Sequence, residues 1–174
     1  KGKDKIQNQL INNLKDFLNE ASAKKVISEA SGISGIGIGV AGLIDRKLGR
    51  IIQSPNISAI NGMALREIFE KEFSLPVTVE NDANAYAYGE KWIGAGKDID
   101  NFIVLTLGTG LGGGLIYKGH LYEGPMEVGH MTIVPSGRYC TCGSSGCLES
   151  YASGRAIVDR AISSLEKGTE SLLL

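Results

Sequence analysis

The feature that constrains this chain most is a cysteine-rich stretch in its C-terminal half. All three cysteines of the 174-residue sequence fall within eight residues, and a histidine stands ten residues before the first of them. Three thiolates and one imidazole form a complete tetrahedral ligand set for Zn²⁺. An odd number of closely spaced cysteines suits metal ligation in a reducing compartment better than it suits disulfides. The spacing therefore predicts a structural zinc site with the ligands His130, Cys140, Cys142 and Cys147; the alternative is three buried or incidental thiols.

Two carboxylates lie beside these predicted ligands. Glu127 comes three residues before His130, and Glu149 comes two residues after Cys147. One interpretation is that the metal loop holds both carboxylates in place for binding. The other is that they are surface groups or hydrogen-bond partners of the metal ligands. Their positions alone leave both interpretations open.

Charge and hydropathy exclude some classes of function. The chain has 18 basic and 19 acidic residues, which provides no electrostatic argument for nucleic-acid binding. Its apolar runs are far shorter than the roughly 18–20 residues of a membrane helix. It shows no signal-peptide pattern. We therefore expect a cytoplasmic protein that does not interact with a membrane.

The order of predicted elements indicates α/β architecture. Hydrophobic periodicity predicts helices over residues 5–24, 64–73, 83–92 and 150–165. Short apolar runs predict strands over residues 36–40, 50–53, 77–79, 102–107, 115–117, 120–122 and 131–134. The segment Gly94–Asp98 is the best linker candidate.

Two further segments could carry chemistry. Residues 108–114, GTGLGGG, form a predicted glycine-rich turn, which is either an anion-binding loop for phosphate or a hairpin whose glycines only permit unusual backbone angles. Asn81 and Asp82 follow a predicted strand. Ligand groups in α/β folds collect at such strand ends, but Asp82 is also a suitable cap for the following helix.

Taken together, these residues resemble the ROK family, named for repressors, open reading frames and kinases. The matching segments are GIGIGVAGLID, SPN, VENDANAYAYGEKWIGAG, LTLGTGLGGG, EVGHMTI and CTCGSSGCLE. They occur in the family's order between Ile36 and about Gly154. Within the family, the sequence is most similar to bacterial glucokinases.

The resemblance implies an actin-like, ribonuclease H-like fold with two α/β domains around a cleft. Residues 1–97 would then be part of the small N-terminal domain, and residues 98–174 the first part of the large domain with the zinc loop. The implied activity is ATP-dependent transfer of the γ-phosphate to the 6-hydroxyl of a hexose. The alternatives are a sugar-sensing transcriptional repressor and a non-catalytic sugar-binding module.

The resemblance also implies residue roles. Asp82 matches the catalytic base, and the turn residues Thr109 and Gly110 match the phosphate contacts. The residues that match sugar-binding positions are Asn56, Asn81, Asp82, Glu127, His130 and Glu149. Mg²⁺ would arrive with ATP, and Zn²⁺ would be structural. The family often forms homodimers, and we expect nucleic acid as a partner only if a winged-helix domain precedes this chain.

Parts of the family pattern have no counterpart here. The N-terminal Asp-x-Gly-x-Thr phosphate hairpin and the C-terminal adenosine-binding segment are missing from these residues, so we expect part of a longer protein. Met126 stands where the family usually has glycine, and residues 57–60 replace a common tryptophan. Both positions border the expected sugar pocket, which leaves the identity of the sugar open.

Overall fold

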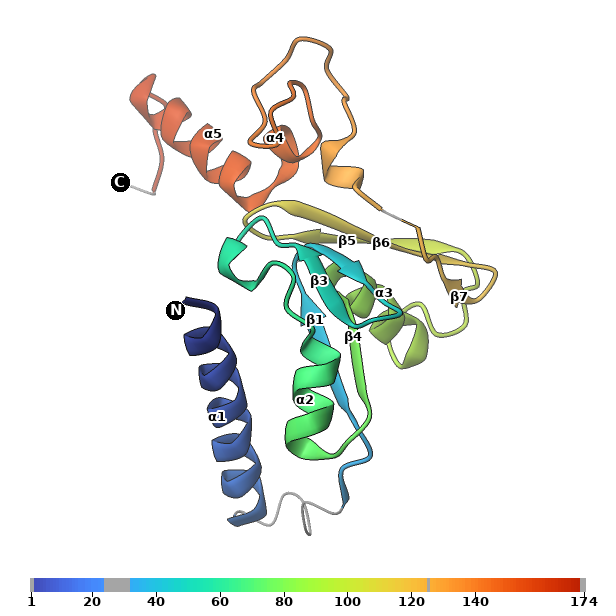
Figure 1. Ribbon diagram of the computed structural model, residues 1–174. Helices are drawn as coiled ribbons and strands as arrows, with labels where there is room; N and C mark the ends of the chain where they lie inside the picture. Colours follow the sequence, from blue (N-terminus) through green and yellow to red (C-terminus); the bar gives the residue numbers. More distant parts are fainter. Residues whose placement is uncertain (1, 24–31, 125, 173–174) are drawn as a thin grey trace. The chain divides into compact units, whose positions relative to one another are not determined.

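The structure, a computed structural model, describes residues 2–23, 32–124 and 126–172 (Figure 1). Its contacts divide the chain into two compact units, residues 1–82 and 83–174. Both units combine helices with strands, which confirms the predicted α/β class. The contact-defined division precedes the predicted linker, and the domain boundary after residue 97 stays a prediction.

The first unit contains two small sheets. Strand β1 pairs in parallel with β4, so that Ile36 lies opposite Val77 and Val40 lies opposite Asn81. Strands β2 and β3 form an antiparallel pair. The elements of this unit are α1 (Gly2–Ala23), β1 (Ile36–Val40), β2 (Leu43–Asp45), β3 (Arg50–Gln53), η2 (Ser58–Ile60), α2 (Leu65–Phe73) and β4 (Val77–Asn81). Strand β2 was not predicted, because three residues are too few to show an alternating pattern.

The core of the first unit forms where α2 covers the strands. Its buried side chains are Ile51, Ile60, Met63, Leu65, Phe69, Val77 and Val79. Ile6 and Leu14 of α1 pack against this cluster, and Lys15 of α1 forms an ion pair with Glu72 of α2. Helix α1 is thereby joined to the rest of the unit, as the predicted apolar stripe requires. No helix in the described part of the chain is long and apolar enough to cross a membrane.

The Arg66 side chain of α2 ties three backbone segments together. Its Nε donates to the carbonyl of Val77 at 3.0 Å, and its two terminal nitrogens donate to the carbonyls of Lys47 and Arg46. These carbonyls belong to β4 and to the turn between β2 and β3. A planar guanidinium can satisfy several acceptors at fixed angles, whereas an ammonium cannot reproduce this geometry.

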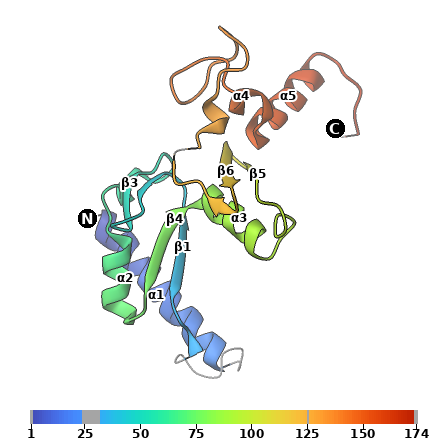
Figure 2. The same cartoon turned by 90° about the vertical axis from the view of Figure 1, so that its right-hand side faces the viewer.

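The second unit is built on an antiparallel sheet with strand order β5-β6-β7. Helix α3 leads into it, and two helices end it. The elements are α3 (Asp82–Trp92), β5 (Phe102–Leu107), β6 (Leu111–Tyr117), β7 (His120–Leu121), η3 (Val128–His130), α4 (Glu149–Ala152) and α5 (Gly154–Glu166). Figure 2 shows the loop that joins η3 to α4 on the side of the sheet where α4 and α5 lie.

The glycine run belongs mostly to a strand, which corrects the predicted turn over residues 108–114. Strand β6 begins at Leu111, so the turn itself spans only residues 108–110. A Cβ at Gly114 would lie 2.6 Å from the Ala83 carbonyl and 2.7 Å from Cβ of Ala87, and one at Gly113 would overlap Val128. These glycines therefore let α3 and η3 approach the strand closely.

Two other predictions were wrong in detail. Residues 131–134 form no strand, because the only β contact there is an isolated bridge between Thr132 and Cys147. The predicted final helix is broken at Ser153, which has an extended backbone and caps α5 by accepting a hydrogen bond from the Ala156 amide. Helix α4 before the break has only four residues.

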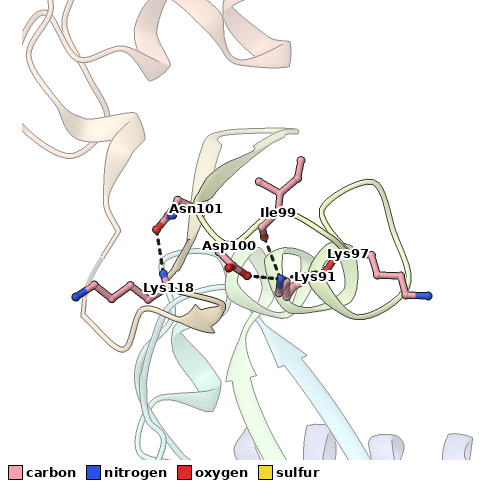
Figure 3. A network of polar contacts seen from close by, with 6 residues as sticks. All are labelled: Lys91, Lys97, Ile99, Asp100, Asn101 and Lys118. Carbon is pink, nitrogen blue, oxygen red and sulfur yellow. Dashed lines mark hydrogen bonds and ion pairs between the residues drawn. The ribbon is translucent and has the colours of Figure 1, made fainter.

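Lys91 fixes the connection from α3 to β5 (Figure 3). Its ammonium lies 3.1 Å from the carbonyls of Lys97 and Ile99 and 3.0 Å from Oδ1 of Asp100. The Asn101 side chain accepts a hydrogen bond from the Lys118 amide at 3.0 Å. The segment between Lys91 and β5, which contains the predicted linker, is thus held by specific polar contacts.

We predict that Arg66→Ala lowers the local stability of the β2–β3 turn. Three backbone carbonyls would lose a charged donor, and the expected cost is about 2 kcal/mol. Native-state hydrogen exchange of the amides in residues 43–53 measures the free energy of local opening. Lys71→Ala, on the same helix, is the control and should leave exchange nearly unchanged. Equal exchange in both variants would contradict the role assigned to Arg66.

Candidate functional site

The predicted metal ligands converge in the second unit. His130 ends η3, and the three cysteines lie in the loop before α4. The donor atoms of His130, Cys140, Cys142 and Cys147 all lie within 4.8 Å of one another. Nδ1 of His130 is 3.8 Å from Sγ of Cys140, and the Sγ atoms of Cys142 and Cys147 are 3.8 Å apart.

These distances fit a four-coordinate ion. Zinc–sulfur bonds of about 2.3 Å in a tetrahedron place the sulfur atoms about 3.8 Å apart. The donor set of three sulfurs and one imidazole suits a soft or borderline metal rather than Mg²⁺ or Ca²⁺. The four residues could therefore hold a metal ion such as Zn²⁺ without moving far. Nδ1 of His130 faces the sulfur atoms, so Nε2 is available to a second partner.

Tight turns bring the cysteines together. The Gly143 amide donates to the Cys140 carbonyl at 3.0 Å, and the Cys140 amide donates to the Ser144 carbonyl at 2.8 Å. Gly146 has φ +75°, and a Cβ there would overlap the Val134 carbonyl. Only glycine fits this position at low cost. The loop also contacts α4, because Tyr151 Oη accepts from the Arg138 amide at 2.8 Å.

The thiols do not titrate alike. Burial acts to raise the pKa of the Cys140 thiol, but hydrogen bonds from the Cys142 backbone and from the side chains of Cys142, Ser150 and Cys147 bring it down to about 7. Burial and the neighbouring thiols raise the pKa of Cys147 to about 11. A bound cation would stabilise all three thiolates.

Glu149, the first residue of α4, joins the metal loop to the glycine turn. Its Oε2 accepts a hydrogen bond from the Leu111 amide at 2.8 Å. Its Oε1 lies 4.0 Å from Sγ of Cys140. Glu149 therefore contacts a predicted metal ligand and also accepts a hydrogen bond from a backbone amide of β6, while its role in ligand binding stays a prediction.

The glycine turn is held from several sides. The Gly108 carbonyl accepts from the Gly154 amide at 3.0 Å, and a Cβ at Gly110 would overlap the Glu149 carboxylate. The amides of Thr109 and Gly110 donate no hydrogen bond to any atom in the described part of the chain. An anion-binding turn provides such unclaimed amides, meaning backbone N–H groups without an acceptor among the described residues.

In the first unit, Asn81 and Asp82 lie where β4 meets α3. The Asn81 side chain donates to the Gly42 carbonyl at 3.1 Å, and its own amide donates to Oε1 of Glu80 at 2.9 Å. Glu80 also forms an ion pair with Arg46. Asp82 is exposed at the first position of α3. A carboxylate there complements the helix dipole and remains accessible.

The remaining predicted residues are exposed on loops. Asn56 follows β3, and Glu127 immediately precedes η3 and accepts the His130 amide on its carbonyl. Sequence reasoning missed the supporting residues Arg46, Glu80 and Tyr151. Their partners in the ion pair and in the hydrogen bond to Arg138 are distant in sequence, and no local sequence pattern predicts such contacts.

Comparison with known proteins connects these features. The profile of the ROK family matches residues 1–172. The xylose repressor of Caldicellulosiruptor bescii is 40% identical over 97% of this chain and 42% of its own length. The glucokinase of Thermotoga maritima is 40% identical over 85% of this chain and 49% of its own length. The glucokinase of Streptomyces coelicolor is 48% identical over 72% of this chain and 41% of its own length. The chain thus spans less than half the length of these relatives.

Solved structures agree with the sequence comparison. A ROK family transcriptional regulator, described as a homologue of the Escherichia coli MLC protein, aligns with 98% of this chain and with 43% of its own chain. The TM-score is 0.87 and the sequence identity is 31%. The Streptomyces griseus glucokinase, solved with glucose and AMPPNP, covers 92% with a TM-score of 0.73 and 40% identity, over 51% of its own chain. This chain therefore belongs to the ROK family and has the α/β, actin-like ATPase fold of that family's kinases.

Proposed function

We propose that this chain is part of an ATP-dependent sugar kinase that transfers the γ-phosphate to the 6-hydroxyl of a hexose. The observation that carries the proposal is Asp82, an exposed carboxylate at the junction of β4 and α3, in a chain 40–48% identical to glucokinases. Phosphoryl transfer asks the protein for a base at the attacking hydroxyl and for charge stabilisation. We assign Asp82 as that base. The expected compartment is the cytoplasm, where thiol ligands stay reduced.

We assign the sugar contacts to Asn56, Asn81, Asp82, Glu127, His130 and Glu149. Carboxylates, amides and an imidazole can each hold sugar hydroxyls, and orienting the substrate contributes much of the rate. The exposure of Asn56, Glu127 and His130 supports this assignment. For His130, Nε2 would contact the sugar while Nδ1 faces the metal.

We assign Thr109 and Gly110 to the phosphates of ATP, which would bring Mg²⁺. Their unclaimed amides support this role within the described residues. Zn²⁺, held by His130 and the three cysteines, would have a closed set of four protein ligands. Its contribution is to fix the loop, and the proton transfer remains the task of Asp82.

A second candidate is a sugar-responsive transcriptional repressor. The share of this chain that aligns with each relative favours this candidate. The xylose repressor aligns with 97% of the chain, and the two glucokinases align with 85% and 72%. The structural match to the ROK regulator also has the higher TM-score, 0.87 against 0.73. Both candidates share sugar binding, and they differ in whether ATP is consumed or DNA is bound.

The first test separates these candidates in the complete gene product that contains these residues. A kinase should release ADP in a coupled assay with at least one member of a hexose panel. A repressor should instead bind the DNA upstream of its own gene and leave it when the sugar is added. Sugar-dependent DNA release without ADP release from any hexose would reject the kinase.

The second prediction concerns the base. Asp82→Asn should lower kcat about 10²- to 10⁴-fold, because general-base catalysis is lost, while sugar binding measured by calorimetry persists. Asp98→Asn, an exposed carboxylate in the loop before β5, is the matched control and should keep full turnover. Full turnover in Asp82→Asn would remove the assigned base.

The third prediction concerns the metal. Elemental analysis of protein purified without added metal should find about one equivalent of zinc, as a closed four-ligand site requires. Cys142→Ser should lose it, whereas Ser144→Ala in the same loop should retain it. Chelation should expose residues 131–147 to proteolysis and weaken sugar binding, because metal binding and local folding are coupled. Full sugar affinity in metal-free protein would contradict the structural role.

A further inference from the structure

We propose that the metal loop determines the shape of the glycine turn at residues 108–110, and that Glu149 is the positioning residue that connects the loop to Leu111, directly after the turn. Metal occupancy would then control affinity for the phosphates of a nucleotide, in addition to any effect on the sugar. The nucleotide part of this inference rests on the proposed kinase function. The structural part, the link from metal to turn, does not.

The first observation is the divided use of the Glu149 carboxylate. One oxygen accepts the Leu111 amide at 2.8 Å, and the other lies 4.0 Å from the sulfur of Cys140. Glu149 follows the ligand Cys147 by two residues, and the Leu148 amide donates at 2.9 Å to the carbonyl of Met131, the residue after the ligand His130. Coordination of His130 and Cys147 would therefore fix the backbone that carries this carboxylate. The oxygen at the Leu111 amide is thereby held directly after the turn.

The second observation is that both ends of the metal loop touch the turn or Leu111. At one end, Gly129 precedes the ligand His130, and a Cβ on Gly129 would overlap the Leu111 carbonyl. At the other end, the Gly154 amide donates to the Gly108 carbonyl at 3.0 Å. The turn and Leu111 are therefore contacted by the residue that directly precedes His130 and by Gly154, which lies just beyond α4.

The third observation is that the fit is tight. A Cβ at Gly110 would overlap the Glu149 carboxylate, so the turn and the carboxylate are already in contact. Loss of the metal would release His130 and Cys147 and so loosen the backbone that carries Glu149. The Leu111 amide would then lose its acceptor, and the neighbouring unclaimed amides of Thr109 and Gly110 would lose their fixed positions. Anion binding by backbone amides depends on that fixed arrangement.

The test uses the complete, metal-loaded gene product and two readouts. Hydrogen exchange of the Leu111 amide reports the link itself, and calorimetry with a non-hydrolysable ATP analogue reports phosphate affinity. Removing the metal should speed exchange at Leu111 and weaken analogue binding, each by about tenfold, as expected for one lost charge-assisted hydrogen bond. Restoring zinc should reverse both changes.

Variants at Glu149 separate positioning from simple sugar contact. Glu149→Ala should reproduce both effects with metal still bound. Glu149→Gln keeps an oxygen acceptor and should retain slow exchange at Leu111. Glu166→Ala, at the exposed end of α5, is the control. If Glu149→Ala does not fold, chelation of the wild type and of Glu149→Gln still provides the test.

The outcomes are distinguishable. Unchanged exchange at Leu111 on both metal removal and Glu149→Ala overturns the inference, and sugar binding alone would then account for Glu149. Faster exchange without any nucleotide binding or turnover rejects the kinase while the metal-to-turn link stands. Faster exchange with unchanged analogue affinity overturns the proposed control of phosphate binding.

Discussion

The convergence of four donor atoms within 4.8 Å is the constraint on which the second unit depends. The loop that carries them has almost no hydrophobic core. Met131, Ile133 and Tyr139 are largely exposed, whereas Cys140 and Cys147 are buried. A segment of this kind cannot offset its conformational entropy by apolar burial. Metal coordination would supply the missing stabilisation, and the hydrogen bond between the Leu111 amide and the Glu149 carboxylate joins the end of the loop to β6.

Close packing by glycine is the second constraint. Gly113 and Gly114 let the two faces of β6 be approached by Val128 and by α3, and Gly110 leaves room for Glu149. The same run of glycines therefore serves two purposes in one stretch. Its first part forms a turn with accessible amides, and its later part allows a helix and a 3-10 turn to pack directly on a strand.

The candidate functions differ less than their names suggest. A kinase and a sugar-responsive repressor of this family can share a sugar-binding scaffold, and a fold alone does not decide between them. On the roles proposed above, the distinction would rest on a few groups, above all on Asp82 and on the turn that contains Thr109 and Gly110. Both are present here, yet the repressor matches more of the chain.

Much of this architecture could be predicted from the sequence, because local patterns encode it. The apolar stripe predicted α1, alternation predicted β1, and an apolar run predicted β5. The cysteine spacing predicted a ligand cluster whose donor atoms do converge. The family was predicted from short motifs, and the match over residues 1–172 confirmed it. These properties depend on residues close together in the chain.

The tertiary structure decided what depends on distant partners. Residues 131–134 look like a strand but form none, since only an isolated bridge at Thr132 provides a neighbour. The pairing of β6 with β5 decided which of the glycines form a turn and which form a strand. The contact of Glu149 with β6 depends on the Leu111 amide, which lies 38 residues away in sequence. Composition and spacing specify which groups are available. Only the fold brings the Glu149 carboxylate and the Leu111 amide together, because their hydrogen bond can form only after α4 and β6 have packed.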